Sequence, residues 1–234
     1  MGGRFAAAID NPRDQWLHEQ LRAMFEKVTR QPERDAVVYL ATKTRPLKKH
    51  KDYACELVFR DAERLVHVRT RPGVFSHREV DGGARALLKT MPIEPGIRVL
   101  DLGCGSGAVG IAAALRAENV QVHATDSNPR AIEAVEWAAD RNGVSSRATA
   151  ALDCDGTSVK PGTFDLVLAN PPYFSNFRIA GLFVAIAGRA LRPGGLLLVV
   201  TKTPEWYLLN LSPGFRSVEA RVVGQYHVVS AMKP

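Results

Sequence analysis

The chain has 234 residues, of which 46% are hydrophobic and 24% are charged. This is the composition of a globular protein with a sizeable core, and it excludes disordered, collagenous and membrane-spanning proteins. The chain holds 31 lysines and arginines against 24 aspartates and glutamates, which gives a formal net charge of +7. A basic surface of this kind favours polyanionic partners such as nucleic acid.

The cysteines and apolar segments point to a reducing compartment. Cys55, Cys104 and Cys154 lie far apart in the sequence, and their spacing fits neither a disulfide framework nor a zinc site. No apolar run approaches the ~18 residues of a membrane helix, and the first ten residues carry no secretion signal. We therefore expect a cytoplasmic protein with no metal and no membrane contact.

Residues 1–70 are predicted to form a small extension that mixes helices and strands. Residues 1–35 have a charged, helical pattern, residues 36–41 predict a buried strand, and residues 52–70 predict a helix followed by a strand. The segment from Lys43 to Lys51 carries five basic residues and no acid. This run is either a solvated face or a set of phosphate contacts, so the extension is a candidate RNA-binding remnant.

Residues 71–234 are predicted to form the main domain, which begins at a turn of Arg71, Pro72 and Gly73. From about residue 80, short apolar strands alternate with helices, which is typical of a doubly wound, mostly parallel α/β sheet. The predicted strands are 97–101, 120–126, 148–153, 164–170 and 195–200. A C-terminal antiparallel hairpin is predicted from the segments 215–223 and 225–232.

A glycine-rich loop after the first strand of this domain is the strongest local signal. Asp101 precedes Gly103, Gly105 and Gly107, and glycine lets the backbone turn tightly and approach a ligand. The spacing excludes a P-loop and disfavours a nicotinamide site. Asp126 ends the next strand, where a carboxylate can hold the two ribose hydroxyls of an adenosine. The alternative is a structural turn with a helix-capping aspartate.

These residues resemble those of class I S-adenosylmethionine-dependent methyltransferases over about residues 70–234. The resemblance implies a Rossmann-like sheet of seven strands whose last two form the antiparallel pair. It also implies that S-adenosylmethionine binds against the glycine loop, that Asp126 holds the ribose, and that Asp153 bonds the adenine amine beside Cys154. The implied cofactor-binding residues are Phe75, Ser76, Asp101, Gly103, Gly105, Gly107, Asp126, Ser127, Asp153, Cys154 and Asn170.

A second motif, Asn170-Pro171-Pro172-Tyr173, follows the fourth strand. Two successive prolines fix the backbone and remove two N–H donors, so this segment offers mainly acceptors. Such a site suits a conjugated amine that donates to the Asn170 side chain and the Pro171 carbonyl while its lone pair faces a sulfonium methyl. Tyr173 offers an aromatic face to a planar substrate. Asn170, Pro171 and Tyr173 are therefore the candidate catalytic residues, and the alternative is a rigid turn with a packed tyrosine.

The methyl acceptor is inferred from two further resemblances. In class I methyltransferases, the Asn170–Tyr173 tetrad resembles that of enzymes acting on exocyclic or amide nitrogens. The segment from Thr70 to Leu88 resembles the lead-in to the cofactor loop of bacterial ribosomal RNA guanine-N2 methyltransferases. The resemblance implies methylation of a guanine N2 in ribosomal RNA, with RNA as the partner. The alternatives are a protein glutamine-N5 or other amine N-methyltransferase, and a non-catalytic RNA-binding module. The sequence does not specify the oligomeric state.

Overall fold

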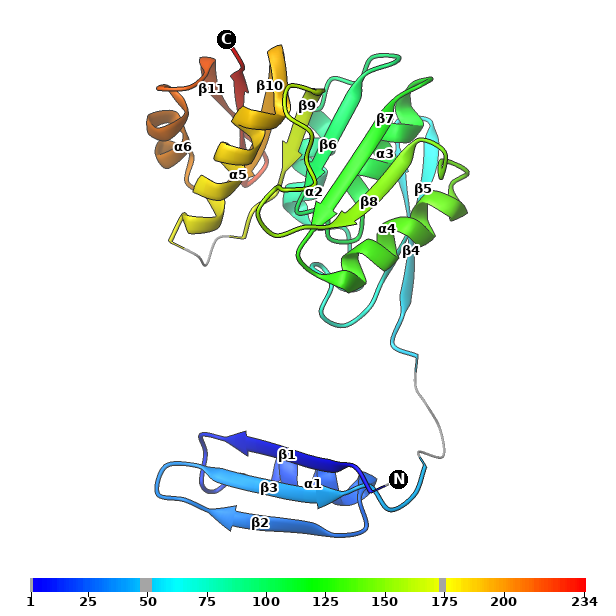
Figure 1. The fold of residues 1–234 in the computed structure, drawn as a ribbon, viewed down its shortest axis with the longest axis vertical. Helices are drawn as coiled ribbons and strands as arrows, with labels where there is room; N and C mark the ends of the chain where they lie inside the picture. The colour runs from blue at the N-terminus through cyan, green and yellow to red at the C-terminus, as the bar shows by residue number, and fades with distance from the viewer. Residues whose placement is uncertain (1, 47–51, 173–175) are drawn as a thin grey trace. The chain divides into compact units, whose positions relative to one another are not determined.

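The computed structural model describes residues 2–46, 52–172 and 176–234 (Figure 1). The chain divides into two compact units, Met1–Asp52 and Tyr53–Pro234, each of which is described here by itself. Residues 47–51 of the predicted basic run lie outside the described residues, as does Tyr173. The phosphate contacts and the aromatic role assigned to them stay predictions. Among the described residues, no helix combines the length and the apolar character needed to span a membrane.

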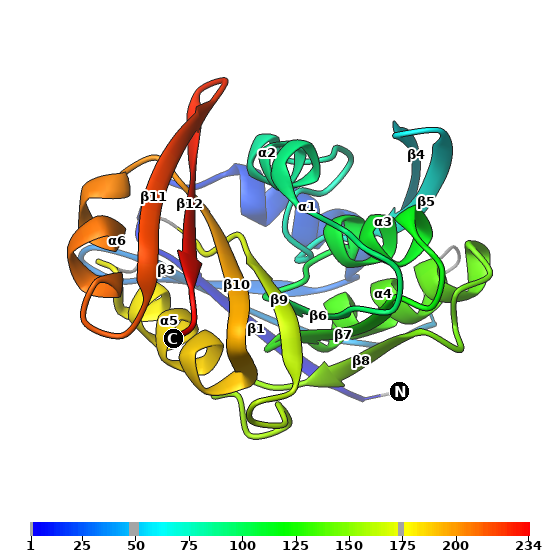
Figure 2. The same ribbon diagram turned by 90° about the horizontal axis from the view of Figure 1, so that it is seen from above.

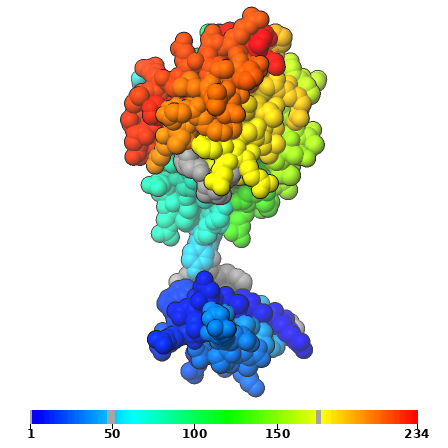
Figure 3. Space-filling view, turned by 90° about the vertical axis from the view of Figure 1, so that its left-hand side faces the viewer, coloured from blue at the N-terminus to red at the C-terminus, as the bar shows by residue number. Residues whose placement is uncertain are grey.

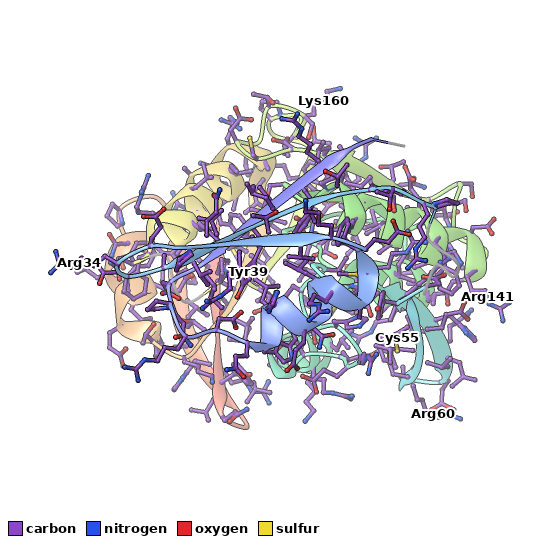
Figure 4. All side chains as sticks on the ribbon, turned by 90° about the horizontal axis from the view of Figure 1, so that it is seen from below. Arg34, Tyr39, Cys55, Arg60, Arg141 and Lys160 are labelled. Atoms are coloured by element: carbon purple, nitrogen blue, oxygen red, sulfur yellow. The ribbon has the colours of Figure 1, made fainter. Side chains whose placement is uncertain are left out.

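The smaller unit is a three-stranded antiparallel sheet packed against one helix. Its elements are β1 (Arg4–Ile9), α1 (Trp16–Met24), β2 (Val28–Pro32) and β3 (Val37–Thr42), and β3 is the central strand. Tyr39 lies between β3 and α1 (Figure 4), and its hydroxyl donates to Asp14 Oδ2 at 2.9 Å. The helical prediction for residues 1–35 is therefore wrong outside α1. The alanines of β1 favour a helix locally, but pairing with β3 holds them extended.

The larger unit is built on a seven-stranded sheet in the order β11-β12-β10-β9-β6-β7-β8. The pairs formed by β10, β9, β6, β7 and β8 are parallel, whereas β12 runs antiparallel to both β10 and β11. This confirms the predicted doubly wound sheet with a C-terminal antiparallel hairpin. The strands are β6 (Arg98–Leu102), β7 (Gln121–Asp126), β8 (Ala148–Leu152), β9 (Phe164–Ala169), β10 (Leu191–Thr201), β11 (Arg216–Val223) and β12 (Tyr226–Met232).

Helices cover both faces of this sheet (Figure 2). One face packs against α2 (Gly82–Thr90), α3 (Ala108–Arg116) and α4 (Pro129–Arg141), and the other against α5 (Arg178–Ala190) and α6 (Pro204–Leu211). Adjacent strand residues face opposite cores: Val99 belongs to the first core and Leu100 to the second, and both are fully buried. Burial on both sides explains why these strands are continuously apolar in the sequence.

A hairpin precedes the sheet and packs onto its helices. The strands β4 (Cys55–Asp61) and β5 (Arg64–Thr70) pair in antiparallel fashion, so the helix predicted near residue 52 is wrong. Both oxygens of Asp61 accept bonds of 2.8 Å from the Arg116 guanidinium on α3. The Asn142 amide that ends α4 bonds the His67 backbone N–H at 3.0 Å and C=O at 2.7 Å. These contacts place the hairpin in the larger unit, whereas the sequence divided the chain at residue 70.

Candidate functional site

The sheet register brings the two predicted motifs together at one edge. Leu102 at the end of β6 pairs with Ala169 at the end of β9, so the glycine loop and Asn170 leave the sheet side by side. The strand order reverses between β6 and β9, because the chain runs from β6 outward to β8 and then returns to β9 on the other side. Ligands of open α/β sheets bind at such a switch point, beyond the carboxyl ends of the strands.

A cavity of about 320 Å³ opens at this edge, which falls in the size range of small-molecule sites. Seven of the predicted site residues line it: Phe75, Gly103, Asp126, Ser127, Asp153, Cys154 and Asn170. A smaller recess of about 30 Å³ adds Ser76, Asp101 and Gly105. Gly107 and Pro171 line neither space. The register and the cavity together assemble most of the predicted set.

The glycine loop lies close to a helix that faces it. Gly103 has a positive φ of 73°, and a Cβ there would lie 2.9 Å from Cζ of Phe183 on α5. The backbone therefore needs glycine both for its conformation and for space. Gly107 is needed for the fold, because it caps α3 at φ 77° and a Cβ there would lie 2.9 Å from Val135 Cγ2. The cofactor contact predicted for Gly107 stays a prediction.

Asp126 connects the glycine loop to the end of β7. Its Oδ2 accepts from the Gly105 N–H and its Oδ1 from the Asn128 N–H, both at 2.9 Å. A carboxylate oxygen has two acceptor positions, so each can take a further bond. Two parallel acceptors at the wall of the cavity suit a vicinal diol such as that of a ribose. The residues present thus fit an adenosine-bearing cofactor at this position.

Asp101 lies behind the loop and is 5% exposed. Its Oδ2 accepts from the Gly110 N–H of α3 at 2.9 Å. Burial raises the pKa of Asp101 to about 7, the Gly110 N–H opposes this rise, and the charge of Asp126 adds to it. A carboxyl group held between strand and helix in this way fixes the loop, and the cofactor contact predicted for Asp101 stays a prediction.

Asp153 lines the cavity but is bonded within its own loop. Its Oδ1 accepts from the N–H groups of Asp155 at 3.0 Å and Gly156 at 2.7 Å, and its Oδ2 accepts from the N–H and hydroxyl of Ser158. Burial favours the neutral acid, but these donors hold the pKa of Asp153 well below its usual range. Four donors occupy the four acceptor positions of the carboxylate, so the predicted adenine bond requires one of them to give way.

Asn170 is held by a carboxylate that the sequence did not single out as a site residue. Asp81 caps the N-terminus of α2, where its Oδ2 accepts from the N–H groups of Gly83 at 2.8 Å and Ala84 at 3.2 Å. The same oxygen accepts from Asn170 Nδ2 at 2.8 Å. An aspartate followed by an apolar run is an N-cap signal that locates the helix, but the contact with Asn170 spans 89 positions.

Helix α5 supplies apolar groups on the other side of the cavity, and α6 lies beside α5 on the surface in Figure 3. Ile179, Leu182, Phe183 and Ile186 of α5 complete its lining, and the sequence did not identify them. Phe177 at the start of α5 stacks on Trp206 of α6, with ring centroids 4.9 Å apart and an interplanar angle of 4°. The signal that could have identified these α5 residues is that an apolar helix follows the Asn-Pro-Pro segment directly.

Residues 65–230 match the family described as the methyltransferase small domain. Since this match covers more than half of the chain, the chain belongs to that family. Its seven-stranded sheet with an antiparallel C-terminal hairpin is the class I methyltransferase fold that the sequence predicted. The glycine loop and the Asn-Pro-Pro segment follow β6 and β9 of this sheet.

The chain is similar to several proteins named as ribosomal RNA methyltransferases. The ribosomal RNA small subunit methyltransferase C of Hahella chejuensis is 33% identical over 169 residues, covering 68% of this chain and 48% of that protein. The protein of the same name from Shewanella halifaxensis is 27% identical over 225 residues, covering 93% of this chain and 65% of that one. The chain therefore spans only about half to two thirds of these relatives.

A solved structure matches the fold over the full chain. The Thermus thermophilus 16S rRNA N2 methyltransferase, in complex with AdoMet and guanosine, has a TM-score of 0.86 and is 24% identical. The match covers 100% of this chain and 66% of that one. TrmN from the same organism has a TM-score of 0.58 at 22% identity over 88% of this chain. At these identities the likeness establishes the fold.

Proposed function

We propose that the chain is an S-adenosylmethionine-dependent N-methyltransferase that acts on the exocyclic N2 of a guanine in ribosomal RNA. The observation that carries this proposal is the position of Asn170, which lines the cavity directly beside the glycine loop and donates a hydrogen bond to Asp81. The names of the relatives, and the AdoMet and guanosine bound in the Thermus structure, support the same assignment. Protein glutamine-N5 methylation is the alternative with a similar acceptor.

The cofactor would be held by groups from both sides of the cavity. Asp126 would accept from the ribose hydroxyls, and Gly103 would allow the backbone to approach the methionine part. Phe183 and Ile186 line the apolar side and would contact the adenine. When bound, S-adenosylmethionine supplies a methyl group attached to a positively charged sulfur. The roles of Phe75, Ser76, Ser127, Asp153 and Cys154 in this binding are part of the proposal.

The acceptor amine would be oriented by oxygen atoms. The Asn170 side-chain oxygen and the Pro171 carbonyl would accept from its two N–H groups and so aim the nitrogen lone pair at the methyl group. Fixed acceptors stabilise the positive charge that develops on nitrogen during transfer, and they keep the reacting atoms in line. As the nitrogen takes up the methyl group, the carbon–sulfur bond of the donor would break and its electron pair would stay on sulfur. The charged amine would then release one proton to water, so no strong base is needed beside Asn170 and Pro171. Tyr173 is proposed to stack on the substrate base.

A basic groove supports RNA as the acceptor. Arg69, Arg71 and Arg130 line a cavity of about 140 Å³ together with Trp137, and Glu133 is the acidic residue in its lining. The Arg69 guanidinium lies 5.8 Å from the Trp137 ring centroid. Arg71 pairs with Glu133 at 3.6 Å, and both side chains are about half exposed. Such an exposed pair is weak, so a phosphate group can replace the carboxylate.

Methyl transfer from tritiated S-adenosylmethionine tests the proposal. The substrates are deproteinised small-subunit RNA, assembled small subunits and total protein from cells that lack this gene. We expect label in RNA, recovered as N2-methylguanosine by nucleoside mass spectrometry. Asn170→Ala should lower kcat at least about 100-fold with cofactor affinity preserved, whereas Asn11→Ala in an exposed loop of the smaller unit should change neither. Label in the protein fraction would favour the glutamine alternative, and absence of cofactor binding would favour the RNA-binding module.

A further inference from the structure

We propose that Asp81 is a positioning residue that sets the orientation of the Asn170 side chain for methyl transfer. The inference rests on the proposed function, because it assigns Asp81 a role through the acceptor site of that same reaction. Asp81 belongs to the loop before α2, and Asn170 follows β9. Their contact joins two parts of the chain that the sheet topology brings together at the switch point.

The contact defines which way the amide faces. Asp81 Oδ2 lies 2.8 Å from Asn170 Nδ2, and an ionised carboxylate can only accept hydrogen bonds. The NH₂ group of Asn170 must therefore face Asp81. The side-chain oxygen, bonded to the same carbon, then points away from the Asp81 carboxylate and can accept from a substrate. With the amide reversed, two oxygens would face each other and the amine of the substrate would meet a donor. Asp81 thus selects the orientation that methyl transfer requires.

Asp81 is itself fixed, so it can act as an anchor. The N–H groups of Gly83 and Ala84 donate to the same Oδ2 that binds Asn170. The carboxylate thereby caps the N-terminus of α2, so the helix sets its position. On the other side, Pro171 and Pro172 restrict the backbone that follows Asn170. With the backbone restricted, the side chain of Asn170 can still rotate about its own torsions. The hydrogen bond to Asp81 stops this rotation.

Gly83 provides the space for this contact. A Cβ at Gly83 would lie 2.7 Å from Asn170 Oδ1 and 2.8 Å from Asp81 Oδ2. Real Cβ atoms do not approach so closely, so any other residue would push the amide and the carboxylate apart. Helix propensity alone would favour alanine over glycine here by about 1 kcal/mol. The contact with Asn170, and not the helix, therefore explains why residue 83 is a glycine.

A double-mutant cycle tests the proposal. Serine caps helices about as well as aspartate but is too short to reach Asn170, so Asp81→Ser keeps the cap of α2 and removes the contact. We expect Asp81→Ser to lower kcat on small-subunit RNA about 100-fold with little change in KM. Asp81→Asn retains an acceptor oxygen and should restore most of the activity. In an Asn170→Ala background, Asp81→Ser should cause no further loss.

A second readout is independent of activity. The side-chain NH₂ resonances of Asn170 in ¹⁵N-labelled protein should shift, and exchange faster with water, in Asp81→Ser, while calorimetry shows unchanged affinity for S-adenosylmethionine. Equal losses from Asp81→Ser in the wild-type and Asn170→Ala backgrounds would overturn the positioning role, as would unchanged amide resonances. If the wild-type chain methylates neither RNA nor protein, the proposed function fails, and the resonances still decide whether Asp81 orients Asn170.

Discussion

Replacing Asp101 by asparagine should remove a pH dependence of stability that the structure builds into the glycine loop. The folded chain holds the Asp101 proton up to about pH 7, whereas the ordinary pKa of the group is 3.8. The folded state thus binds more protons than the unfolded state between these values, so the free energy of unfolding falls as the pH rises through this interval. The contribution of Asp101 to the free energy of unfolding is fully present below pH 3.8 and is lost above about pH 7.

The magnitude follows from the two pKa values. At about 1.36 kcal/mol per pKa unit, the whole interval corresponds to about 4 kcal/mol, and the part crossed between pH 5 and pH 8 to about 3 kcal/mol. Asparagine keeps an oxygen to accept from the Gly110 N–H but does not ionise. The stability of Asp101→Asn relative to wild type should therefore increase by about 3 kcal/mol from pH 5 to pH 8.

Urea unfolding at the two pH values measures this difference. Trp16 lies in the smaller unit, whereas Trp137 and Trp206 lie in the larger one, so a Trp16→Phe background makes tryptophan fluorescence report on the larger unit. The other titrating groups are common to both proteins and cancel in the comparison. A stability difference between variant and wild type that is the same at pH 5 and pH 8 would refute the assignment of a neutral, buried carboxyl at Asp101.

Three further perturbations test the loop, the hairpin and the groove. Gly103→Ala should weaken S-adenosylmethionine binding at least about tenfold by calorimetry, whereas Gly96→Ala, at φ 77° with nothing within 4 Å, should leave it unchanged. Arg116→Ala breaks a largely buried ion pair and should cost about 3–5 kcal/mol in urea unfolding, and Arg71→Ala, in an exposed pair, less than about 1 kcal/mol. In RNA binding, Arg71→Gln combined with Arg130→Gln should reduce the salt slope by about 2; an unchanged slope would exclude phosphate contacts in the groove.

The sequence located the two motifs because each depends on local backbone chemistry. A positive φ such as that of Gly103 favours glycine, and the prolines after Asn170 restrict the chain whatever surrounds it. Strand assignment then followed from continuous apolar runs, since both faces of the sheet are buried. Local signals of this kind predicted the alternating strands of the larger unit and, together with the family resemblance, seven of the fifteen residues that line the cavity.

What the sequence did not predict depends on contacts between distant residues. The hydrogen bond between Asp81 and Asn170 joins residues 89 positions apart. Nothing in the sequence around either residue indicates that the other is its partner. Residues 55–61 form a strand that pairs with β5 and bonds to Arg116 through Asp61, and neither partner can be identified from the segment itself. The loop donors that surround Asp153 are likewise set by the path of the chain after β8. Tertiary contacts decide such features, and a single sequence does not reveal them.

A crystal structure of this chain with S-adenosylhomocysteine and guanosine 5′-monophosphate would test the central claim most directly. We predict that the guanine N2 lies about 3 Å from the Asn170 side-chain oxygen and the Pro171 carbonyl, on the side facing the sulfur, with the ribose of the cofactor on Asp126. A cofactor bound elsewhere, or an Asn170 amide that turns its NH₂ group toward the base, would contradict the account.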